Sequence, residues 1–298
     1  MRTRSTLPVA LVAVAALALS ACSSASQDGD AGATGEAFDL ASITKDADIA
    51  ALVPAAVAED GKLTVGSDLT YAPAEFVDTD GKTAVGFDID IIRAVANVLG
   101  LELDVQSATF DSIIPAVGTR YEVGVSSFTI TPERLDAVSF VSYFDAGSLF
   151  AVAEGNPDGI DPENLCGATV SVQTGTIQLD ALNAANETCD EPIKLLTFES
   201  QADVTSNLVN GRAQAMYADS PVTGYAVLRA DGAIELLGEI HDSAPYGIVI
   251  PKDDLELGEA LRAALQKLMD DGTLAQVAGA WGQAEGVLAT AEIKTAAG

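Results

Sequence analysis

The feature that most constrains the fold is an alternation, from Lys62 onward, between short runs rich in strand-forming residues and longer amphipathic segments. Such alternation is typical of a sheet whose strands are connected by crossover helices. We interpret the first part of this pattern as one lobe. Its predicted strands cover residues 63–67, 103–106 and 123–129. Of its predicted helices, one runs to Gly100 with Asp88 as its cap and the other covers residues 112–117.

A second set of alternating elements follows an extended run over residues 148–153 and indicates a second lobe. The hydrophobic content of 48% is ample for a packed core in one large domain or in two small lobes. The predicted strands of this set are 169–172, 193–197 and 215–218, and its predicted helices start at Thr176 and Ser220 or cover 202–210. A C-terminal portion resumes with a strand over 246–250 and a helix over 255–271. A short last helix ends near Trp281, which we expect to pack in the core.

Charge narrows the range of partners. Lys and Arg total 15 against 44 Asp and Glu, which gives a net charge of -29. So acidic a chain repels phosphate backbones and anionic lipid surfaces. We therefore expect no nucleic-acid partner.

The N-terminus indicates export. Arg2 and Arg4 precede an apolar run over residues 7–19, which is too short to span a bilayer comfortably but suits the core of a signal peptide. The run ends in Leu19-Ser20-Ala21-Cys22, which resembles a bacterial lipobox. We predict a signal peptide over 1–21, a lipid-modified Cys22 and a flexible tether over 22–45, with the protein held on the outer face of the cytoplasmic membrane or cell envelope. The alternative is a plain signal peptide.

The two remaining cysteines, Cys166 and Cys189, form an even pair in an oxidising compartment. Each precedes a predicted strand, so parallel neighbouring strands would place both thiols at one end of the sheet. We predict a disulfide. A metal site would need more ligands than these two residues and the distant His241 provide, and we predict neither metal nor cofactor.

The segment over residues 126–134 carries the chemistry of a carboxylate clamp. As a strand that runs into a helix, it would place Ser127 and Thr129 on one strand face, Thr131 at the N-cap and Arg134 in the first turn. A guanidinium offers a planar pair of donors to a carboxylate, and the hydroxyls supply further donors. The alternative is an ordinary strand-loop-helix in which Arg134 is a surface charge.

Taken together, several motifs between Lys62 and Gly282 resemble the amino-acid-binding family of ABC-importer solute-binding proteins, family three. They occur in the same order as in that family. They are GSDLTYAP (66–73), GFDID (86–90), FDSIIPA (110–116), SFTITPER (127–134), VQTGT (172–176), ADSP (218–221), YGI (246–248) and DGT (271–273).

The resemblance implies a two-lobed, type II periplasmic-binding-protein-like α/β fold. Lobe one would comprise residues 60–144 and 246–285, and lobe two residues 149–241. Two hinge strands, near 144–148 and 242–245, would connect them. Ligand would lie in the cleft and bring the lobes together.

The resemblance also implies roles for nine residues. Arg134, Thr129 and Ser127 would hold the α-carboxylate of the ligand, with N–H donors at the helix start of Thr176. Asp219 would receive the α-ammonium group. Tyr71 and Phe110 would form aromatic walls, or else pack in the core, and Asp68 and Gln173 would set selectivity, although Asp68 could equally cap its own loop.

The expected function is extracytoplasmic capture of a polar amino acid with a neutral or cationic side chain. A monomer would deliver it to an ABC permease with its ATPase and would contact the membrane through its lipid anchor only. We do not expect an enzyme. Two alternatives remain open: an exported dehydratase acting on prephenate or arogenate, which would share the fold, and a lipoprotein that presents ligand to a sensor.

Overall fold

The computed structural model describes residues 38–296, and in this range the predicted α/β class is confirmed. The strands are β1 (Lys62–Ser67), β2 (Thr70–Tyr71), β3 (Glu75–Val77), β4 (Ala84–Val85), β5 (Glu102–Ser107), β6 (Val123–Gly124), β7 (Val138–Ala153), β8 (Thr169–Gln173), β9 (Lys194–Phe198), β10 (Ala215–Asp219), β11 (Ile234–Pro251) and β12 (Ile293–Lys294). The helices are η1 (Leu40–Ser42), α1 (Ala47–Ala50), α2 (Ala55–Ala58), α3 (Phe87–Leu99), α4 (Phe110–Ala116), α5 (Pro132–Ala137), α6 (Ile177–Asn186), α7 (Gln201–Val209), α8 (Ser220–Arg229), α9 (Leu255–Asp270), α10 (Thr273–Gly279) and η2 (Ala284–Gly286).

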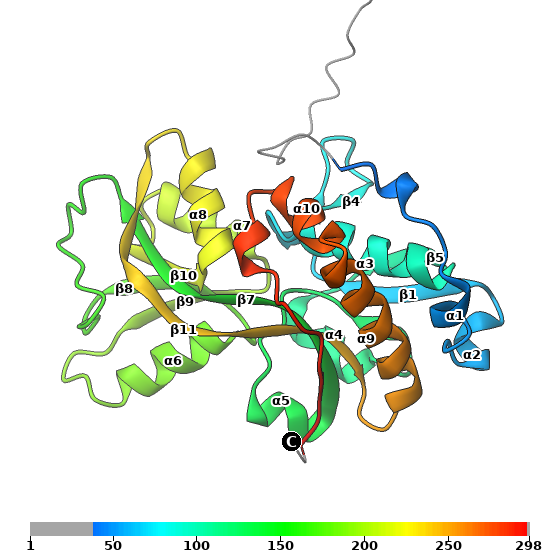
Figure 1. Ribbon diagram of the computed structural model, residues 1–298. Helices are drawn as coiled ribbons and strands as arrows, with labels where there is room; N and C mark the ends of the chain where they lie inside the picture. The colour runs from blue at the N-terminus through cyan, green and yellow to red at the C-terminus, as the bar shows by residue number, and fades with distance from the viewer. Residues whose placement is uncertain (1–37, 297–298) are drawn as a thin grey trace, which may run out of the picture. The chain divides into compact units, whose positions relative to one another are not determined.

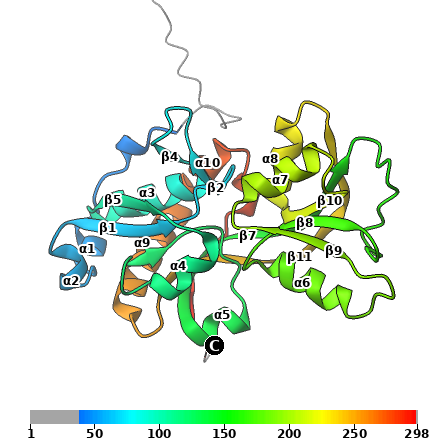
Figure 2. The same cartoon turned by 180° about the vertical axis from the view of Figure 1, so that it is seen from behind.

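One sheet runs through both halves of the described chain in the order β5-β1-β6-β11-β7-β10-β8-β9 (Figure 1). We name the half built on β1, β5 and β6 lobe one, and the half built on β8, β9 and β10 lobe two. In lobe one, α3 and α9 lie on one face of the sheet and α4 on the other; in lobe two, α7 and α8 lie opposite α6 (Figure 2). Parallel pairs within each lobe, β1 with β5 and β8 with β9, match the crossover pattern of the sequence.

The long antiparallel strands β7 and β11 connect the lobes and contain the predicted hinge segments. They pair from Val138 opposite Pro251 to Ala153 opposite Ile234, with shifts of register between Leu237 and Gly247. Such irregularities interrupt the ladder of hydrogen bonds locally, and they occur where the strands pass between the lobes. These are the positions at which the strands can bend.

The sequence located β11 only from Tyr246 onward, whereas the strand begins twelve residues earlier at Ile234. The missed part contains Gly238 at φ +78° and Asp242 at φ +51°. Both residue types favour turns, and both conformations break the alternation expected of a strand. Pairing with β7 nevertheless keeps the segment extended.

Each lobe has its own apolar packing. In lobe one, Ile91 and Ile92 of α3 and Leu261 and Leu265 of α9 are fully buried in one cluster. In lobe two, the Phe150 ring of β7 stacks on the Tyr217 ring of β10 at 3.9 Å between centroids, within a separate cluster. Burial of such side chains contributes about 1.5–3 kcal/mol each. Each lobe is therefore stabilised by its own core, and β7 and β11 connect the two.

Residues 38–45 differ from the expected end of the tether. Phe38, Leu40 and Ile43 pack against the core of lobe one, and the Asn97 side chain donates a hydrogen bond to the carbonyl of Leu40 at 2.9 Å. These three apolar side chains follow the polar part of the predicted tether in the sequence. They bury apolar surface, which the polar residues before them cannot do. The signal peptide, Cys22 and the rest of the predicted tether lie outside the described residues. Within residues 38–296, no helix is long and apolar enough to cross a membrane.

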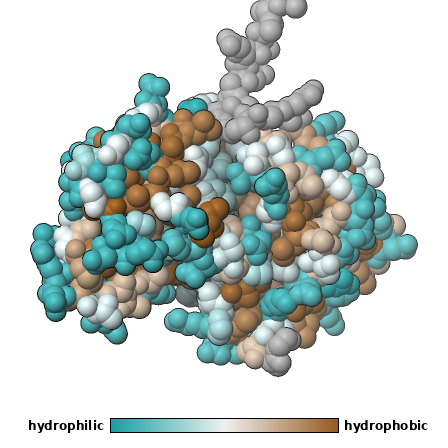
Figure 3. Space-filling view, turned by 60° about the vertical axis from the view of Figure 1, so that its left-hand side comes forward, coloured by the Kyte–Doolittle hydropathy of each residue, from teal (hydrophilic) through white to brown (hydrophobic). Residues whose placement is uncertain are grey.

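On the face shown in Figure 3, hydrophilic surface alternates with hydrophobic areas. Large apolar side chains exposed on lobe two include Leu228, Leu236 and Ile240, which are 65%, 47% and 56% exposed. They lie on α8 and β11 around a hollow that also reaches Trp281. Trp281 itself is buried, as expected, and its indole N–H donates to Asp90 at 2.8 Å.

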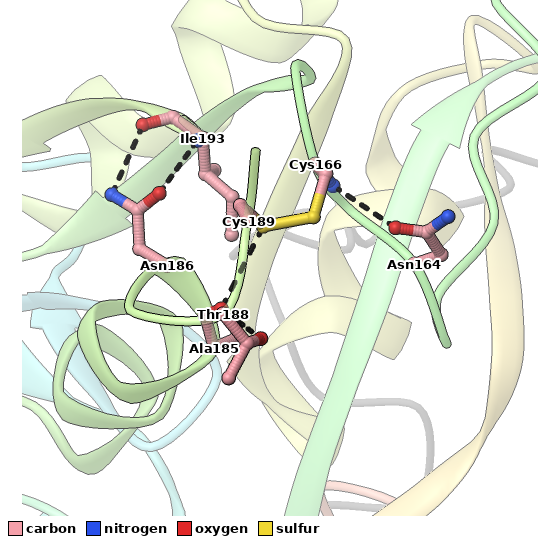
Figure 4. Close-up of a disulfide and its surroundings, with 7 residues drawn as sticks. All are labelled: Asn164, Cys166, Ala185, Asn186, Thr188, Cys189 and Ile193. Carbon is pink, nitrogen blue, oxygen red and sulfur yellow. Dashed lines mark hydrogen bonds between the residues drawn. A yellow bond between two sulfur atoms is a disulfide. The ribbon is translucent and has the colours of Figure 1, made fainter. Parts of the chain in front are cut away.

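The predicted disulfide is present in lobe two. Cys166 and Cys189 are bonded, with their Cα atoms 5.3 Å apart (Figure 4). They precede the parallel neighbours β8 and β9, as the sequence indicated. Beside the bond, the amide of Asn186 donates to the carbonyl of Ile193 and accepts from its N–H. The disulfide therefore fastens the end of α6 to the loop before β8.

We expect the Cys166→Ser/Cys189→Ser double variant to lose about 3 kcal/mol of unfolding free energy, because the crosslink restricts the unfolded chain. Urea unfolding with and without reductant measures the loss. The control is the double variant itself, which reductant should leave unchanged. A wild-type midpoint that does not move on reduction would contradict the prediction.

Candidate functional site

A small cavity lies between the lobes, with an enclosed volume of about 10 Å³, roughly the space for one water molecule. All the predicted binding residues except Asp68 and Gln173 line it. Its walls are Tyr71, Phe110, Ser127, Thr129 and Arg134 from lobe one, and Thr176, Ile177, Gln178 and Asp219 from lobe two.

Arg134 is held at the cavity by the start of α5. As predicted, the Thr131 side chain caps this helix by accepting from the Arg134 N–H at 3.2 Å, and Pro132 occupies the first turn. The guanidinium Nη1 donates to the carbonyl of Thr129 at 2.8 Å. The same group lies over the ring of Phe110 at 5.4 Å, a distance at which a cation and an aromatic face attract each other. These contacts hold the guanidinium at the cavity wall.

Arg134 also contacts lobe two. The guanidinium Nη2 of Arg134 donates to the carbonyl of Gly175 at 3.3 Å. Gly175 has φ +76°, and a Cβ there would lie 2.9 Å from the Cβ of Asp111 in α4. Glycine is needed both for this backbone conformation and for the close approach of the lobes.

The predicted strand over residues 123–129 is wrong beyond its first two residues. β6 covers only Val123–Gly124, and Ser127 has φ +50°, which is not a strand conformation. Thr129 makes a single bridge to Tyr246 of β11. A loop, rather than one strand face, therefore brings Ser127 and Thr129 to the cavity.

The prediction that Asp88 caps α3 is also wrong. The N-cap is Gly86 at φ +130°, where any Cβ would clash with the carbonyl of Ala74. Asp88 is buried in the first turn, where it accepts from the N–H of Ser127 at 2.7 Å and from the hydroxyl of Tyr143 at 2.6 Å. Burial raises the pKa of Asp88 to about 6, although these hydrogen bonds oppose the rise.

Lobe two contributes the start of α6. The Thr176 side chain accepts from the Leu179 N–H at 3.2 Å and donates to the carbonyl of Gln173 at 2.8 Å, so it is the N-cap of the helix that was predicted to start there. The first N–H groups of a helix have no partner within it and carry partial positive charge. This end of α6 suits an anionic group.

Asp219 ends β10 and is 5% exposed. It accepts from the Tyr71 hydroxyl at 2.9 Å, a contact that joins the two lobes. Burial raises the pKa of Asp219, and the nearby Tyr246 hydroxyl and the hydrogen bonds from Tyr71 and Gln178 oppose the rise. These donors and Arg134 support the ionised form, which is the form that can bind a cation.

Sequence reasoning missed Gln178. Its amide donates to Asp219 at 2.7 Å and to the hydroxyl of Ser148 on β7 at 2.7 Å, so it fixes the carboxylate against the connecting strand. The signal was available, because Gln178 follows the predicted helix start at Thr176 by two residues. The first turn of a helix aimed at a cleft exposes its side chains as well as its N–H groups to that cleft.

Tyr71 and Phe110 both line the cavity and pack in the apolar core. Tyr71 is 5% exposed and Phe110 9% exposed, and both belong to apolar clusters. The ring of Phe110 stacks on Phe128 at 4.6 Å between centroids. The two interpretations offered by the sequence are therefore compatible.

Asp68 and Gln173 do not line the cavity, and they bond to each other instead. Gln173 Nε2 donates to Asp68 at 2.5 Å and to the carbonyl of Glu199 at 2.8 Å. Asp68 also accepts from the hydroxyl of Thr70 in its own loop at 2.9 Å. Burial raises the pKa of Asp68, and the bonds from Thr70 and Gln173 oppose this. The pair bridges the lobes beside the cavity.

His241 lies on β11 opposite Ser148 and is not among the residues that line the cavity. Within residues 38–296, no three His, Cys, Asp or Glu side chains are grouped so that they could hold a metal ion. The chemistry available at the cavity is recognition of opposite charges, an anion by Arg134 and a cation by Asp219.

Comparison with known proteins agrees with this geometry. The sequence profile of the bacterial extracellular solute-binding proteins, family 3, matches residues 63–284. The Arginine-binding protein ArgT of Corynebacterium glutamicum is 38% identical over 248 residues, 81% of each chain.

Two solved structures are similar over most of the chain. An ancestral arginine-binding protein bound to arginine superposes with a TM-score of 0.70 at 32% identity, over 74% of this chain and 98% of that one. The ancestral amino-acid-binding protein AncCDT-1, described as a precursor of cyclohexadienyl dehydratase, gives 0.69 at 35% identity, over 76% and 97%.

Proposed function

Because the chain belongs to the bacterial extracellular solute-binding proteins of family 3, we propose that it captures arginine outside the cytoplasm and delivers it to an ABC permease. The observation that carries the proposal is the placement of Arg134 and Asp219, on different lobes, at one cavity. An α-amino acid carries one charge for each of them.

In the proposed complex, the α-carboxylate lies on Arg134, Ser127 and Thr129, near the first N–H groups after Thr176. The α-ammonium group lies on Asp219. Because the two charges belong to different lobes, only the closed arrangement satisfies both, and binding shifts the protein toward closure.

The cavity volume of about 10 Å³ is too small for an amino acid. The lobes must therefore separate to admit the ligand, and bending of β7 and β11 at their register shifts provides the movement. The bonds from Tyr71 to Asp219 and from Gln173 to Asp68 join the lobes and must loosen during entry.

The side chain of the ligand is proposed to be cationic. Among residues 38–296 that line the cavity, Arg134 alone is positively charged, and the α-carboxylate occupies it. Asp68 lies beside the cavity with its charge available to a guanidinium once Gln173 moves aside. The net charge of -29 attracts cations before contact, and two of the three proteins cited above are named for arginine.

Calorimetry with purified mature protein tests the proposal. Arginine should bind more tightly than glutamine and much more tightly than glutamate at neutral pH, and it should raise the unfolding temperature by mass action. If glutamate binds more tightly than arginine, the electrostatic argument is wrong.

A dehydratase is the second candidate, because AncCDT-1 is described as a precursor of one. Prephenate carries two carboxylates, whereas the described cavity lining offers the single guanidinium of Arg134. We propose that the protein is not an enzyme. Product formation from prephenate by the purified protein would reverse this.

The proposed location is the outer face of the cytoplasmic membrane or cell envelope, where the protein acts as a monomer tethered through Cys22. We expect Cys22→Ala to release the protein from the membrane fraction, because no thiol remains at the lipobox for lipid attachment. Detergent-free fractionation of cells measures this, with Cys22-containing protein as control. Full membrane retention of the variant would contradict the lipid anchor.

A further inference from the structure

Two buried carboxyl groups, Glu75 of β3 and Asp88 of α3, lie behind the loop that carries Ser127. Both side chains are 0% exposed and neither lines the cavity. Neither has a Lys or Arg partner within residues 38–296. Burial of two unpaired negative charges side by side would cost several kcal/mol, so at least one of them must be neutral.

Their hydrogen bonds distinguish the two groups. Asp88 accepts from the Ser127 N–H at 2.7 Å, the Ser127 hydroxyl at 3.1 Å and the Tyr143 hydroxyl at 2.6 Å. All three partners can donate, which suits an ionised carboxylate. Asp88 is therefore the charged member.

Glu75 has the opposite arrangement. Its Oε1 accepts from the Ser126 hydroxyl at 2.7 Å, but no donor among the described residues reaches Oε2. The side chain lies next to Asp88, because the adjacent residues Ser126 and Ser127 donate to Glu75 and Asp88 respectively, and each carboxyl group acts on the pKa of the other. A proton on Oε2 turns this atom from an acceptor without a partner into a donor, because a carboxylic acid can donate and a carboxylate cannot. It also removes the charge repulsion between Glu75 and Asp88.

We propose that Glu75 is protonated at neutral pH and donates to ionised Asp88, and that this pair positions Ser127 for the ligand carboxylate. Ser127 has φ +50°, a conformation that costs a non-glycine residue free energy and persists only where its surroundings hold it. Its two bonds to Asp88 provide that hold. Glu75 and Asp88 are thus positioning residues, and their effect on ligand rests on the proposed function.

The electrostatic surroundings give the same order of protonation. Burial, with nearby Asp88 and Asp68, raises the pKa of Glu75 well above its ordinary value. The pKa of Asp88 rises only to about 6, because bonds from Tyr143 and Ser127 oppose burial. As pH rises, Asp88 therefore loses its proton before Glu75 does.

Infrared difference spectroscopy of the mature protein tests the protonation without ligand. At pH 7 the carbonyl band of a protonated carboxylic acid should be present in wild type and lost in Glu75→Gln. Absence of that difference would overturn the proposal.

Arginine titration tests the positioning, once wild-type binding is measured. Glu75→Gln keeps a donor to Asp88 and an acceptor for Ser126, so its affinity should stay within about threefold, whereas Glu75→Leu and Asp88→Asn should lose at least about tenfold. Asp90→Asn, two residues along α3 and bonded to Trp281, is the matched control and should bind like wild type.

Equal losses of arginine affinity in Glu75→Gln and Glu75→Leu would overturn the positioning role. If Asp88→Asn fails to fold, the Glu75 pair and the infrared band still decide. If wild type does not bind arginine, the proposed function fails, and the infrared result still judges the protonation.

Discussion

Replacing Arg134 with alanine is expected to lower the affinity for arginine by at least about 100-fold while leaving the lobes folded. The α-carboxylate would be buried without its main counter-charge, a loss of roughly 3–5 kcal/mol. Folding should survive, because the guanidinium makes its bonds to two backbone carbonyls at the cavity edge and forms no salt bridge among the described residues. Isothermal titration calorimetry measures the affinity and circular dichroism the fold.

Arg120→Ala is the matched control. Arg120 also belongs to lobe one and lies over an aromatic ring, that of Tyr121 at 5.2 Å, but it is not part of the cavity lining. This variant removes the same charge from the same lobe, so it separates local binding from long-range attraction. Near-wild-type affinity in Arg134→Ala, or an equal loss in Arg120→Ala, would contradict the carboxylate clamp.

Thr129→Ala should lose less than Arg134→Ala, because a hydroxyl contributes about 0.5–1.5 kcal/mol where a charge contributes more. The comparison ranks the two parts of the clamp.

The sequence predicted the α/β class, the helix cap at Thr131, the helix start at Thr176 and the disulfide, because each depends on local chemistry or on strand order. It placed Arg134 correctly for the same reason, since the cap and Pro132 fix where α5 begins. The motifs that resemble the family then brought residues of two lobes to one cleft, which no local pattern could do.

The errors arose where tertiary contacts override local preference. Ser127 looked like a strand residue, but Asp88 holds it in a left-handed conformation. Asp88 looked like a helix cap, which is an ordinary role for Asp. In the structure its carboxylate instead accepts a hydrogen bond from Ser127 in the loop behind the cavity. Periodicity carries no information about a bond between residues 39 positions apart in sequence.

Asp68 and Gln173 show a different limit. Their motif gave the correct neighbourhood, but the direct bond between them depends on how closely the lobes approach. That distance is set by β7, β11 and the glycine at 175, which no short motif specifies.

The second large effect is expected for Asp219→Asn, which should also lower the affinity for arginine by roughly 100-fold. The α-ammonium group would lose its buried counter-charge, although the amide oxygen can still accept from the Tyr71 hydroxyl. Stability should not fall with affinity. Because the pKa of Asp219 is raised, the folded state holds its carboxylate at a cost that the neutral amide does not carry.

The pH dependence gives an independent measure of the same group. As pH falls through the raised pKa of Asp219, protonation removes the charge that holds the α-ammonium, so wild-type affinity should decrease toward that of Asp219→Asn. The variant should lack the part of this dependence that Asp219 contributes and keep the part that comes from Asp88, whose pKa is about 6. Asp180→Asn removes an exposed carboxylate from α6 and is the control, since Asp180 acts on Arg134 only at a distance. If Asp219→Asn and wild type bind arginine equally at neutral pH, the ammonium lies elsewhere, and the division of the two ligand charges between the lobes is wrong.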